Sequence, residues 1–321
     1  MIWNDLLKTI AKNDKFLICA HESPDGDSIG SQLAFYKYLK NIGKNVAIYN
    51  KDKPPQKFRF LPNCGVIRDV LGNEKFDVLT LMDCSNLQRP AIENINKFAP
   101  KIVNIDHHRD NMEFGDVNCV DVKSAATCRI IYEFFVENNI KIDADMANCL
   151  FAGILTDTSG FQFNNDDGSL YLVANDLVKR GANNAFLFKK LFAQNSLAAL
   201  KIRAKIWETL EFYAHDKISV ISMPKNLLSE YGEDSSATEG MSNLAMNCEN
   251  VEVGVFVKYD DKEVRISLRS AGNVDVGEIA EQCEIGGGHK FAAGCTIKNV
   301  SVKEAIRIIV DKISQRLPAT C

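Results

Sequence analysis

The chain has 321 residues, of which 46% are hydrophobic and 25% are charged. This is the composition of a folded globular protein, and it excludes disordered, collagen-like and coiled-coil chains. At about 150 residues per domain, the length favours two domains. The formal net charge of −4 argues against a protein that coats long duplex nucleic acid, because that mode of binding depends on excess lysine and arginine. A small anionic substrate stays compatible with this charge if basic residues are concentrated locally.

The cysteines and the first residues indicate the compartment. Ten cysteines are scattered through the chain without a CxxC pair, which is typical of reduced thiols rather than of a disulfide framework. The first fifteen residues lack the basic region and the apolar run of a signal peptide. No apolar run approaches the roughly 18 residues of a membrane span. We therefore expect a soluble, cytoplasmic protein with no membrane partner.

The first half of the chain alternates short strand-like runs with amphipathic helical stretches. Strands are predicted at 16–20, 45–49, 77–82 and 101–105. Helices are predicted at 28–42, 124–138, 143–154 and 169–180. This alternation predicts an α/β domain with a mostly parallel sheet, in which the carboxyl ends of the strands lie along one edge.

The second half of the chain begins with a predicted linker helix over residues 196–216, where apolar residues recur at helical spacing. Beyond it, strands are predicted at 217–223, 251–259, 263–270 and 292–297, before a closing helix at 302–317. We expect three parts: a catalytic α/β domain, a long linker helix and a smaller α/β domain for substrate binding, over residues 1–195, 196–216 and 217–321.

The first polar cluster directly follows the first predicted strand. His21, Asp25 and Asp27 lie in one turn, and an imidazole beside two carboxylates is costly unless a cation neutralises them. The alternative is an ordinary helix-capping turn, in which Asp27 or Ser28 caps a helix that begins near Ile29. Capping explains one residue and leaves the other two without a role, so metal binding is favoured.

Further polar residues follow the later strands and the third predicted helix. Asp83 ends a strand, where a single aspartate is usually an ordinary turn residue. Asp106, His107 and His108 follow the next strand, and an aspartate is well suited to orient a histidine that binds a metal. Asp157 ends an apolar helical stretch, where it could also be a simple turn residue.

These side chains together predict a two-metal site. If the strands are parallel, the motifs meet at one edge of the sheet, and their number suits two ions about 3.5–4 Å apart that share one carboxylate and a hydroxide. Mixed imidazole and carboxylate ligands favour Mn²⁺, Co²⁺ or Zn²⁺ over Mg²⁺, which prefers oxygen ligands alone. We expect two divalent ions, Mn²⁺ in the first place, with Mg²⁺ or Co²⁺ as alternatives.

The motifs and their order resemble the DHH phosphoesterase family. The segment HESPDGDSIGS, Asp83, the DHH triplet and Asp157 occur in the family's order. Residues 239–244, 264–280 and 286–294 resemble the DHH-associated C-terminal domain, DHHA1. The chain is most similar to the NrnA type. That resemblance implies a hydrolase that cleaves short oligoribonucleotides of two to five nucleotides to mononucleotides and converts 3′-phosphoadenosine 5′-phosphate (pAp) to AMP.

The resemblance also implies roles for matching residues. One metal would be held by His21, Asp25 and Asp83. The second metal would be held by Asp27, Asp83, His107 and Asp157, so that Asp83 bridges the two ions. A hydroxide between the ions would attack phosphorus. In this scheme Asp106 would orient His107, and His108 would act on the phosphoryl oxygen or the leaving group.

Seven residues are expected to bind the substrate: Arg269, Gly286, Gly287, Gly288, His289, Asn111 and Arg109. A glycine-rich loop lets backbone N–H groups approach a phosphate or a base, and an arginine can grip a phosphate with two hydrogen bonds. The alternatives are a tight turn before a buried strand and a solvated strand end.

Other functions compete with this hypothesis. A RecJ-like single-strand exonuclease, a cyclic- or linear-dinucleotide phosphodiesterase and a family II pyrophosphatase share the first domain, and a nucleotide-binding sensor would not be an enzyme. The sensor is disfavoured because every metal-binding position is filled. The expected partners are short RNA or pAp as substrates, and a homodimer is compatible with the sequence. Phe161 and Phe163 are expected to pack in the core rather than to stack on a base.

Overall fold

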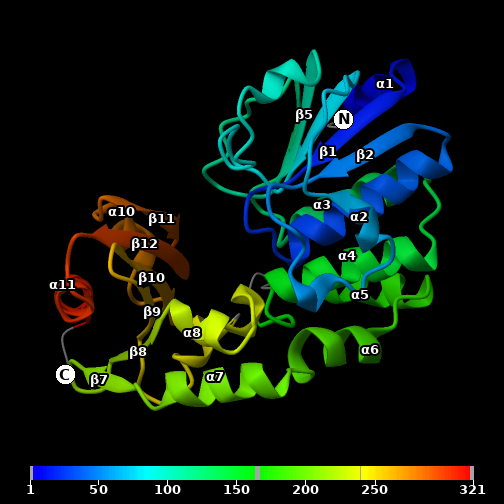
Figure 1. Ribbon diagram of the computed structural model, residues 1–321. Coiled ribbons are helices and arrows are strands. Elements are labelled where there is room, and N and C mark those ends of the chain that lie inside the picture. Colours follow the sequence, from blue (N-terminus) through cyan, green and yellow to red (C-terminus); the bar gives the residue numbers. More distant parts are fainter. Residues whose placement is uncertain (1–2, 163–166, 239, 319–321) are drawn as a thin grey trace. The chain divides into compact units, whose positions relative to one another are not determined.

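Two separate sheets organise the chain, which divides into a first unit, Met1–Gln194, and a second unit, Asn195–Cys321. The computed structural model (Figure 1) describes residues 3–162, 167–238 and 240–318. Phe163, one of the two phenylalanines expected in the core, lies outside these ranges. None of the helices in the described ranges combines the length and the apolar character that a membrane span requires.

The first unit contains a sheet in which every strand pair is parallel. Its strands are β1 (Lys15–Cys19), β2 (Asn45–Tyr49), β3 (Ile67–Arg68), β4 (Val78–Met82), β5 (Lys101–Asp106) and β6 (Val117–Val120). Their order is β3-β2-β1-β4-β5-β6, so the winding direction reverses between β1 and β4. Such a switch point opens a crevice at the carboxyl ends of the strands. The predicted α/β class is confirmed.

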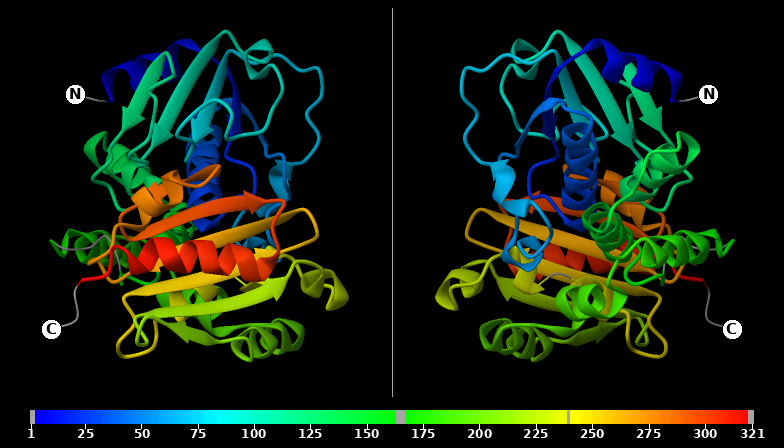
Figure 2. Two further views of the ribbon diagram at one scale, coloured as in Figure 1. Left: turned by 90° about the vertical axis from the view of Figure 1, so that its left-hand side faces the viewer. Right: turned by 90° about the vertical axis from the view of Figure 1, so that its right-hand side faces the viewer.

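The helices of the first unit are α1 (Asn4–Lys12), α2 (Gly26–Asn41), α3 (Thr127–Glu137), α4 (Ala144–Asp157), α5 (Ser169–Lys179) and α6 (Asn184–Phe188). Helices α1, α2 and α3 pack against the sheet, whereas α4 packs on α2 and α3 and in turn contacts α5 and α6 (Figure 1 and Figure 2). A π-helical turn, Lys189–Ala193, follows α6. The opposite face is covered by the connections around β4, through a smaller apolar cluster that includes Phe76, Ile95 and Phe98.

Glycines allow α2 and α4 to approach each other closely. A Cβ atom at Gly30 would overlap the backbone carbonyl of Cys149, and one at Gly153 would lie 2.9 Å from Asp27 Oδ1 and overlap the thiol of Cys128. Only glycine fits such contacts without moving a neighbouring group. The close approach brings the end of α4 next to the start of α2, where two of the polar motifs lie.

The second unit contains a mixed sheet of order β11-β12-β10-β9-β8-β7, in which only β8 and β9 pair in parallel. Its strands are β7 (Glu211–Tyr213), β8 (Ile218–Pro224), β9 (Val253–Tyr259), β10 (Glu263–Ser270), β11 (Ile285–His289) and β12 (Ala292–Lys298). Its helices are α7 (Leu197–Trp207), α8 (Asn226–Glu230), α9 (Met241–Leu244), α10 (Val276–Glu281) and α11 (Val302–Ser314). The apolar faces of α10 and α11 share one core cluster with the sheet, and α7 and α9 share another.

The prediction of one long linker helix over 196–216 is wrong beyond Trp207. There the hydroxyl of Thr209 donates to the carbonyl of Ile206 at 2.7 Å and accepts from the backbone N–H of Ser222 at 2.8 Å. This ends the helix and starts β7, which pairs with β8. The buried face of α7 packs within the second unit, against residues that include Ile221, Met223 and Phe256. The segment is therefore part of that unit's core and not a free spacer.

Candidate metal centre

The turn after β1 holds His21 and Asp25 in place through a helix cap. Asp25 is the N-cap of α2, and its Oδ1 accepts from the backbone N–H groups of Asp27 (3.1 Å) and Ser28 (3.0 Å). The Ser28 hydroxyl accepts from the N–H of Asp25 in return, which completes a capping box. The other oxygen, Oδ2, lies 3.8 Å from Nε2 of the buried His21. Asp25, not Asp27 or Ser28, is thus the cap, and it still offers one oxygen to the site.

Asp27 is fully buried and is fixed by the start of another helix. Its Oδ2 accepts from the N–H of Thr127 at 2.6 Å, and its Oδ1 accepts from that of Cys128 at 2.8 Å. These are the first residues of α3, whose own N-cap, Ala126, has no side-chain acceptor. The helix was predicted to begin near Ser124, but the remote carboxylate caps it three residues later. The helix N-terminus in turn favours a negative charge on Asp27.

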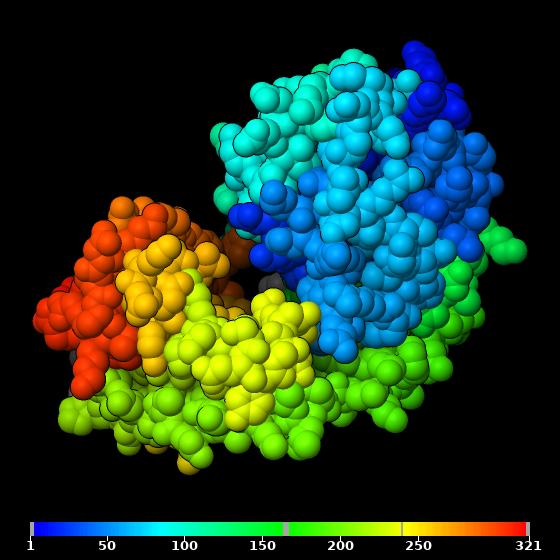
Figure 3. Space-filling model, in the orientation of Figure 1, coloured from blue at the N-terminus to red at the C-terminus, as the bar shows by residue number. Residues whose placement is uncertain are grey.

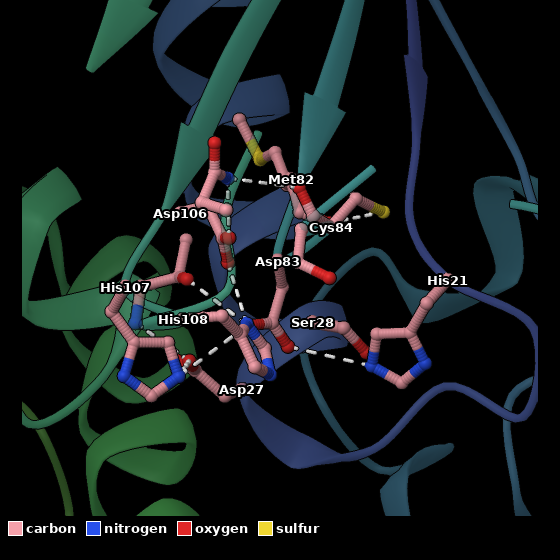
Figure 4. Close-up of polar contacts among 12 residues, drawn as sticks. His21, Asp27, Ser28, Met82, Asp83, Cys84, Asp106, His107 and His108 are labelled. Carbon is pink, nitrogen blue, oxygen red and sulfur yellow. Dashed lines mark hydrogen bonds and ion pairs between the residues drawn. The ribbon is translucent and has the colours of Figure 1, made fainter. Parts of the chain in front are cut away.

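Asp83 lies at the centre of the polar residues that follow the strands (Figure 4). Its Oδ2 is 3.4 Å from Nε2 of His21, and its Oδ1 is 3.6 Å from Nε2 of His107 and 3.6 Å from Nδ1 of His108. Its backbone has a positive φ of 58°, a conformation that aspartate tolerates better than most residues. The Thr127 hydroxyl also donates to Oδ1 at 3.1 Å. The two carboxylate oxygens thus face different histidines.

His107 connects the strand ends with the end of α4. Its Nε2 lies 3.4 Å from Oδ2 of Asp157, the last residue of α4, and 4.0 Å from Oδ2 of Asp27. Its other ring nitrogen, Nδ1, lies 3.2 Å from the backbone carbonyl of Ser124. A carbonyl can only accept, so Nδ1 carries a proton, and Nε2 is the ring nitrogen that faces the two carboxylates.

Asp106 holds His108, which corrects the expectation that it orients His107. Its Oδ1 is 2.7 Å from Nδ1 of His108, and its Oδ2 accepts from the side-chain amide of Asn111 at 2.6 Å. Asp106 is completely buried, so both of its oxygens are used inside the protein. The carbonyl of Ser124 performs for His107 the role that the sequence assigned to Asp106.

The side chains carry more negative charge than they can neutralise among themselves. Burial raises the pKa of Asp157 to about 7, even with His107 beside it. Burial also raises the pKa of Asp27 well above its usual value, and the charges of Asp83 and Asp157 add to this effect. Burial alone would lower the pKa of His107, but the surrounding carboxylates outweigh it and raise the pKa to about 9. Such a group of buried acids favours cations.

The donor atoms fit divalent metal ions. Three overlapping groups have their donor atoms within 4.8 Å of one another: His21–Asp25–Asp83, Asp83–His107–His108 and Asp27–His107–Asp157. Between His21, His107 and the carboxylates the N···O separations are 3.4–4.0 Å, longer than hydrogen bonds, so these atoms face a common space. Carboxylate oxygens with imidazole nitrogens suit Mn²⁺ and similar ions. The fold brings together the six side chains that the sequence singled out as metal ligands.

Asn111 does not reach outward, contrary to the prediction that it binds substrate. Its side-chain N–H₂ donates to Asp106, to Oδ1 of Asn104 at 2.8 Å and to the carbonyl of Cys84 at 3.2 Å. It therefore positions Asp106 and, through it, His108. Arg109, expected beside it in the same role, is exposed in the turn after β5.

The glycines expected in a substrate loop lie instead in a strand. Gly286, Gly287 and Gly288 belong to β11, the edge strand that pairs with β12, and His289 ends it opposite Ala292. Gly288 has φ 143°, and a Cβ atom there would lie 2.5 Å from Cα of Ala293 on the partner strand. Gly288 thus lets two strand backbones approach closely, and a Cβ atom at Gly286 would overlap the carbonyl of Ala280, whereas one at Gly287 meets no atom within 4 Å. The sequence alone did not separate this packing requirement from phosphate binding.

Arg269 is anchored within the second unit. It lies in β10, and its Nε donates to Oδ1 of Asn243 at 2.6 Å, while NH1 donates to the carbonyl of Leu268 at 2.9 Å. Asn243 belongs to the motif at 239–244, whose first residue, Glu239, lies outside the described residues. The guanidinium is held in one orientation, which is what a phosphate-binding fork requires.

Three residues that the sequence did not single out hold the centre together. Thr127 donates to both Asp27 and Asp83, Ser124 orients His107 through its carbonyl, and the amide of Asn104 donates to the carbonyl of Cys84 at 3.0 Å. The polar residues at the start of the helix after residue 123 could have indicated that this helix end contacts the site. Nothing in the sequence shows, however, which remote carboxylate the helix end faces.

Comparison with known proteins identifies the family. Residues 15–154 match the DHH family, N-terminal domain, and residues 217–317 match the DHHA1 domain. A relative from Thermus thermophilus, named bifunctional oligoribonuclease and PAP phosphatase NrnA, is 31% identical over 304 residues, which covers 94% of this chain and 89% of the relative. The chain belongs to the DHH family. The predicted resemblance to DHH proteins with a DHHA1 domain, and to the NrnA type among them, is confirmed.

Two further comparisons agree. A protein of the same name from Bacillus subtilis is 26% identical over 311 residues, which covers 96% of each chain. The crystal structure of an exopolyphosphatase-related protein from Bacteroides fragilis superimposes with a TM-score of 0.87 at 23% identity, covering 98% of this chain and 96% of that one. The latter shows that the two proteins share the same fold.

Proposed function

We propose that this protein is a metal-dependent phosphoesterase that hydrolyses short oligoribonucleotides to mononucleotides and converts pAp to AMP. The observation that carries the proposal is the convergence of His21, Asp25, Asp27, Asp83, His107 and Asp157 around one space in a DHH fold. The relatives named as oligoribonuclease and PAP phosphatase, which match along nearly the whole chain, support the substrate class.

Two divalent ions would be held by these six side chains. His21 and Asp25 face one oxygen of Asp83, while His107 faces the other and connects it with Asp27 and Asp157. When bound, the ions would supply Lewis-acid activation of water and charge neutralisation at the phosphoryl group. Mn²⁺ suits the mixed ligands, with Co²⁺ or Mg²⁺ as alternatives.

His108 is the proposed proton donor to the leaving oxygen. Its Nδ1 donates to Asp106, which fixes the ring and assigns the remaining nitrogen, Nε2, to the substrate. Burial alone would lower the pKa of His108, but the hydrogen bond to Asp106 and the charge of Asp83 raise it to about 10. A cationic imidazole can donate a proton or stabilise developing negative charge.

Recognition of the nucleotide is assigned to the second unit, and hydrolysis to the first. In this proposal the catalytic part is residues 1–195 and the recognition part is residues 217–321. The anchored guanidinium of Arg269 would hold a phosphate remote from the cleaved bond. The net charge of −4 favours a short anionic substrate over a long strand, which needs an extended basic track.

The test is a product assay on protein freed of metal, with and without added Mn²⁺. Its substrates are pAp, an RNA dinucleotide labelled at its 5′ end and a long single-stranded RNA. We expect Mn²⁺-dependent release of phosphate from pAp and of mononucleotide from the dinucleotide, with the long strand cut slowly. Degradation of the long strand alone would favour a RecJ-like exonuclease, and no hydrolysis of any substrate would refute the proposal.

A further inference from the structure

Aromatic rings and lysines gather on the first unit where α6 and the π-helical turn meet the segment at residues 56–60. This cluster, the aromatic shelf, comprises Lys57, Phe60, Phe186, Phe188, Lys190 and Phe192. The ring centroids of Phe188 and Phe192 are 5.1 Å apart, and those of Phe60 and Phe186 are 5.5 Å apart with the rings perpendicular. In Figure 3 the surface of the blue segment around residue 58 adjoins the green surface of α6.

Lysine side chains lie over these rings. Lys190 Nζ is 5.8 Å from the centre of the Phe186 ring, and Lys57 Nζ is 5.7 Å from that of Phe192. Lys189 lies beside Lys190 on the same turn. The combination of aromatic faces with cations is the one that binds single-stranded nucleic acid, because bases stack on the rings and the cations attract the phosphates.

Two of the rings are too exposed to serve only the core. Phe188 is 48% exposed and Phe186 is 43% exposed, whereas Leu187 between them is buried. The helix thus turns Leu187 inward for packing and leaves both neighbouring phenylalanines at the surface. Exposed aromatic side chains that adjoin one another on a soluble protein commonly mark a binding site.

The shelf adjoins the metal centre through the turn that ends α4. A Cβ atom at Gly160 would lie 3.6 Å from Cε2 of Phe188, so the ring packs directly against this glycine. Gly160 follows Asp157 by three residues, and its N–H donates to the carbonyl of Leu155 at 2.7 Å, which folds the turn back onto the helix. Three residues span at most about 11 Å, so the Cα atom of Gly160 lies within that distance of the Cα atom of Asp157. Phe188 therefore packs on the turn that begins at a proposed metal ligand.

We propose that Phe188 stacks on the nucleobase of the nucleotide next to the cleaved phosphate. This inference rests on the proposed function and adds to it a base-binding position on the catalytic unit itself. The neighbouring Lys190 would attract a phosphate of the same substrate. Stacking on a ring does not distinguish among bases, so this position would favour nucleotides over other phosphate esters without selecting a sequence.

The test compares three variants with the wild-type protein. Phe188→Leu keeps an apolar side chain but removes the ring, Phe188→Tyr keeps the ring, and Phe212→Leu removes a comparably exposed phenylalanine, 39% exposed, from the second unit. The substrates are an RNA dinucleotide and the same dinucleotide made abasic at each position in turn. We expect Phe188→Leu to raise the KM for the dinucleotide about tenfold or more. It should change the KM little for the abasic substrate that lacks the stacked base.

Phe188→Tyr and Phe212→Leu should behave like the wild type. A KM for Phe188→Leu within about twofold of the wild-type value on the intact dinucleotide would overturn the inference, as would an equal rise on every abasic substrate. A second measurement does not depend on hydrolysis: a dinucleotide that carries 2-aminopurine should lose fluorescence on binding to the wild type and to Phe188→Tyr but not to Phe188→Leu. Quenching without turnover of any substrate would refute the proposed function and support the stacking position. Turnover without quenching at either base would support the proposed function and refute the stacking position.

Discussion

The two units are built on sheets with the same number of strands, yet they display their functional residues differently. In the first unit every strand is parallel, and the motif residues follow β1, β4 and β5 at the edge where the strands end. In the second unit most pairs are antiparallel, and the motif residues Arg269 and Gly286–His289 lie inside strands β10 and β11. In a parallel sheet the carboxyl ends of the strands lie along one edge, so residues that follow different strands meet there. In the antiparallel part of the second sheet the motif residues lie within the paired strands themselves.

The difference indicates where each unit is sensitive to mutation. The centre of the first unit depends on charged side chains that face one another, so removing one charge should affect catalysis strongly. The proposed substrate-binding residues of the second unit hydrogen-bond to backbone groups and to one another, and they carry none of the proposed metal ligands. Their loss should therefore affect substrate binding more than the chemical step. Four substitutions test this contrast.

The largest effect is expected for Asp83→Asn. Asparagine keeps the left-handed backbone at φ 58° and the shape of the side chain but removes the charge that faces both His21 and His107. We expect kcat to fall at least about 10³-fold, close to 4 kcal/mol of transition-state stabilisation, together with loss of bound Mn²⁺. The measurements are kcat on the dinucleotide and the Mn²⁺ content of the purified protein.

The matched control for this charge is Asp5→Asn. Asp5 lies on α1 with its side chain 74% exposed, paired with Lys8 on the same helix. Its substitution should leave turnover and metal content unchanged. Near-normal kcat in Asp83→Asn would contradict the bridging role and remove the basis for the contrast between the two units.

Asn111→Ala should have an intermediate effect. The substitution removes the amide that donates to Asp106 at 2.6 Å and leaves His108 less firmly oriented. Loss of an outer partner of this kind typically costs about 10–100-fold, and we expect it in kcat with little change in KM. The control is Asn226→Ala, which removes an exposed amide that donates to Glu230 on α8. A rise in KM with unchanged kcat would instead return Asn111 to substrate binding.

Gly153→Ala tests whether close helix packing supports the centre. The added methyl group would lie 2.9 Å from Asp27 Oδ1 and overlap the Cys128 thiol, so α4 must move away from α2. Overpacking of this kind costs about 1–3 kcal/mol, and we expect a lower unfolding midpoint with weaker Mn²⁺ binding. Gly65→Ala is the control, because a Cβ there meets no atom within 4 Å. Equal midpoints and equal Mn²⁺ affinity for the two variants would show that the centre tolerates displacement of α4.

The smallest effect on the chemistry is expected for Arg269→Ala. Its guanidinium is anchored by Asn243, and its removal should raise KM about tenfold for pAp and the dinucleotide while kcat changes little. Arg265→Ala on the same strand is the control, because Arg265 is exposed and its Nε donates to Glu263, a residue outside the proposed site. A large fall in kcat at unchanged KM would place Arg269 in the chemistry and end the distinction between the units.

The grouping of the proposed metal ligands could be predicted from the sequence because each motif follows a strand or ends a helix. Once β1, β4 and β5 are recognised as parallel strands, the positions of His21, Asp83 and the DHH triplet at one edge follow from the topology. Asp157 could be placed only because the helix that it ends was recognised by its apolar pattern. Spacing along the chain did not reveal that Asp27 caps a helix a hundred residues away.

The orientation of the histidines could not be predicted. Asp106 precedes His107 and His108 directly, and sequence order gives no preference for either ring. Both histidines lie just beyond the end of β5, where Asp106 reaches the second ring and the carbonyl of Ser124 reaches the first. Likewise, nothing local marks Asn111 as a buried support instead of a ligand for the substrate.

By itself, the sequence determined the fold class, the family and which side chains gather at the proposed metal centre, because hydrophobic periodicity and motifs can be read along the chain. The tertiary structure alone decided which atoms face each other: Asp83 faces His21 with one oxygen and His107 with the other, and Asp106 bonds His108. It also decided that Gly286–Gly288 belong to a strand and that α7 ends at Trp207. It alone brought Phe188 against Gly160, beside the end of α4. These outcomes depend on packing between segments distant in the chain, and no local pattern encodes such contacts.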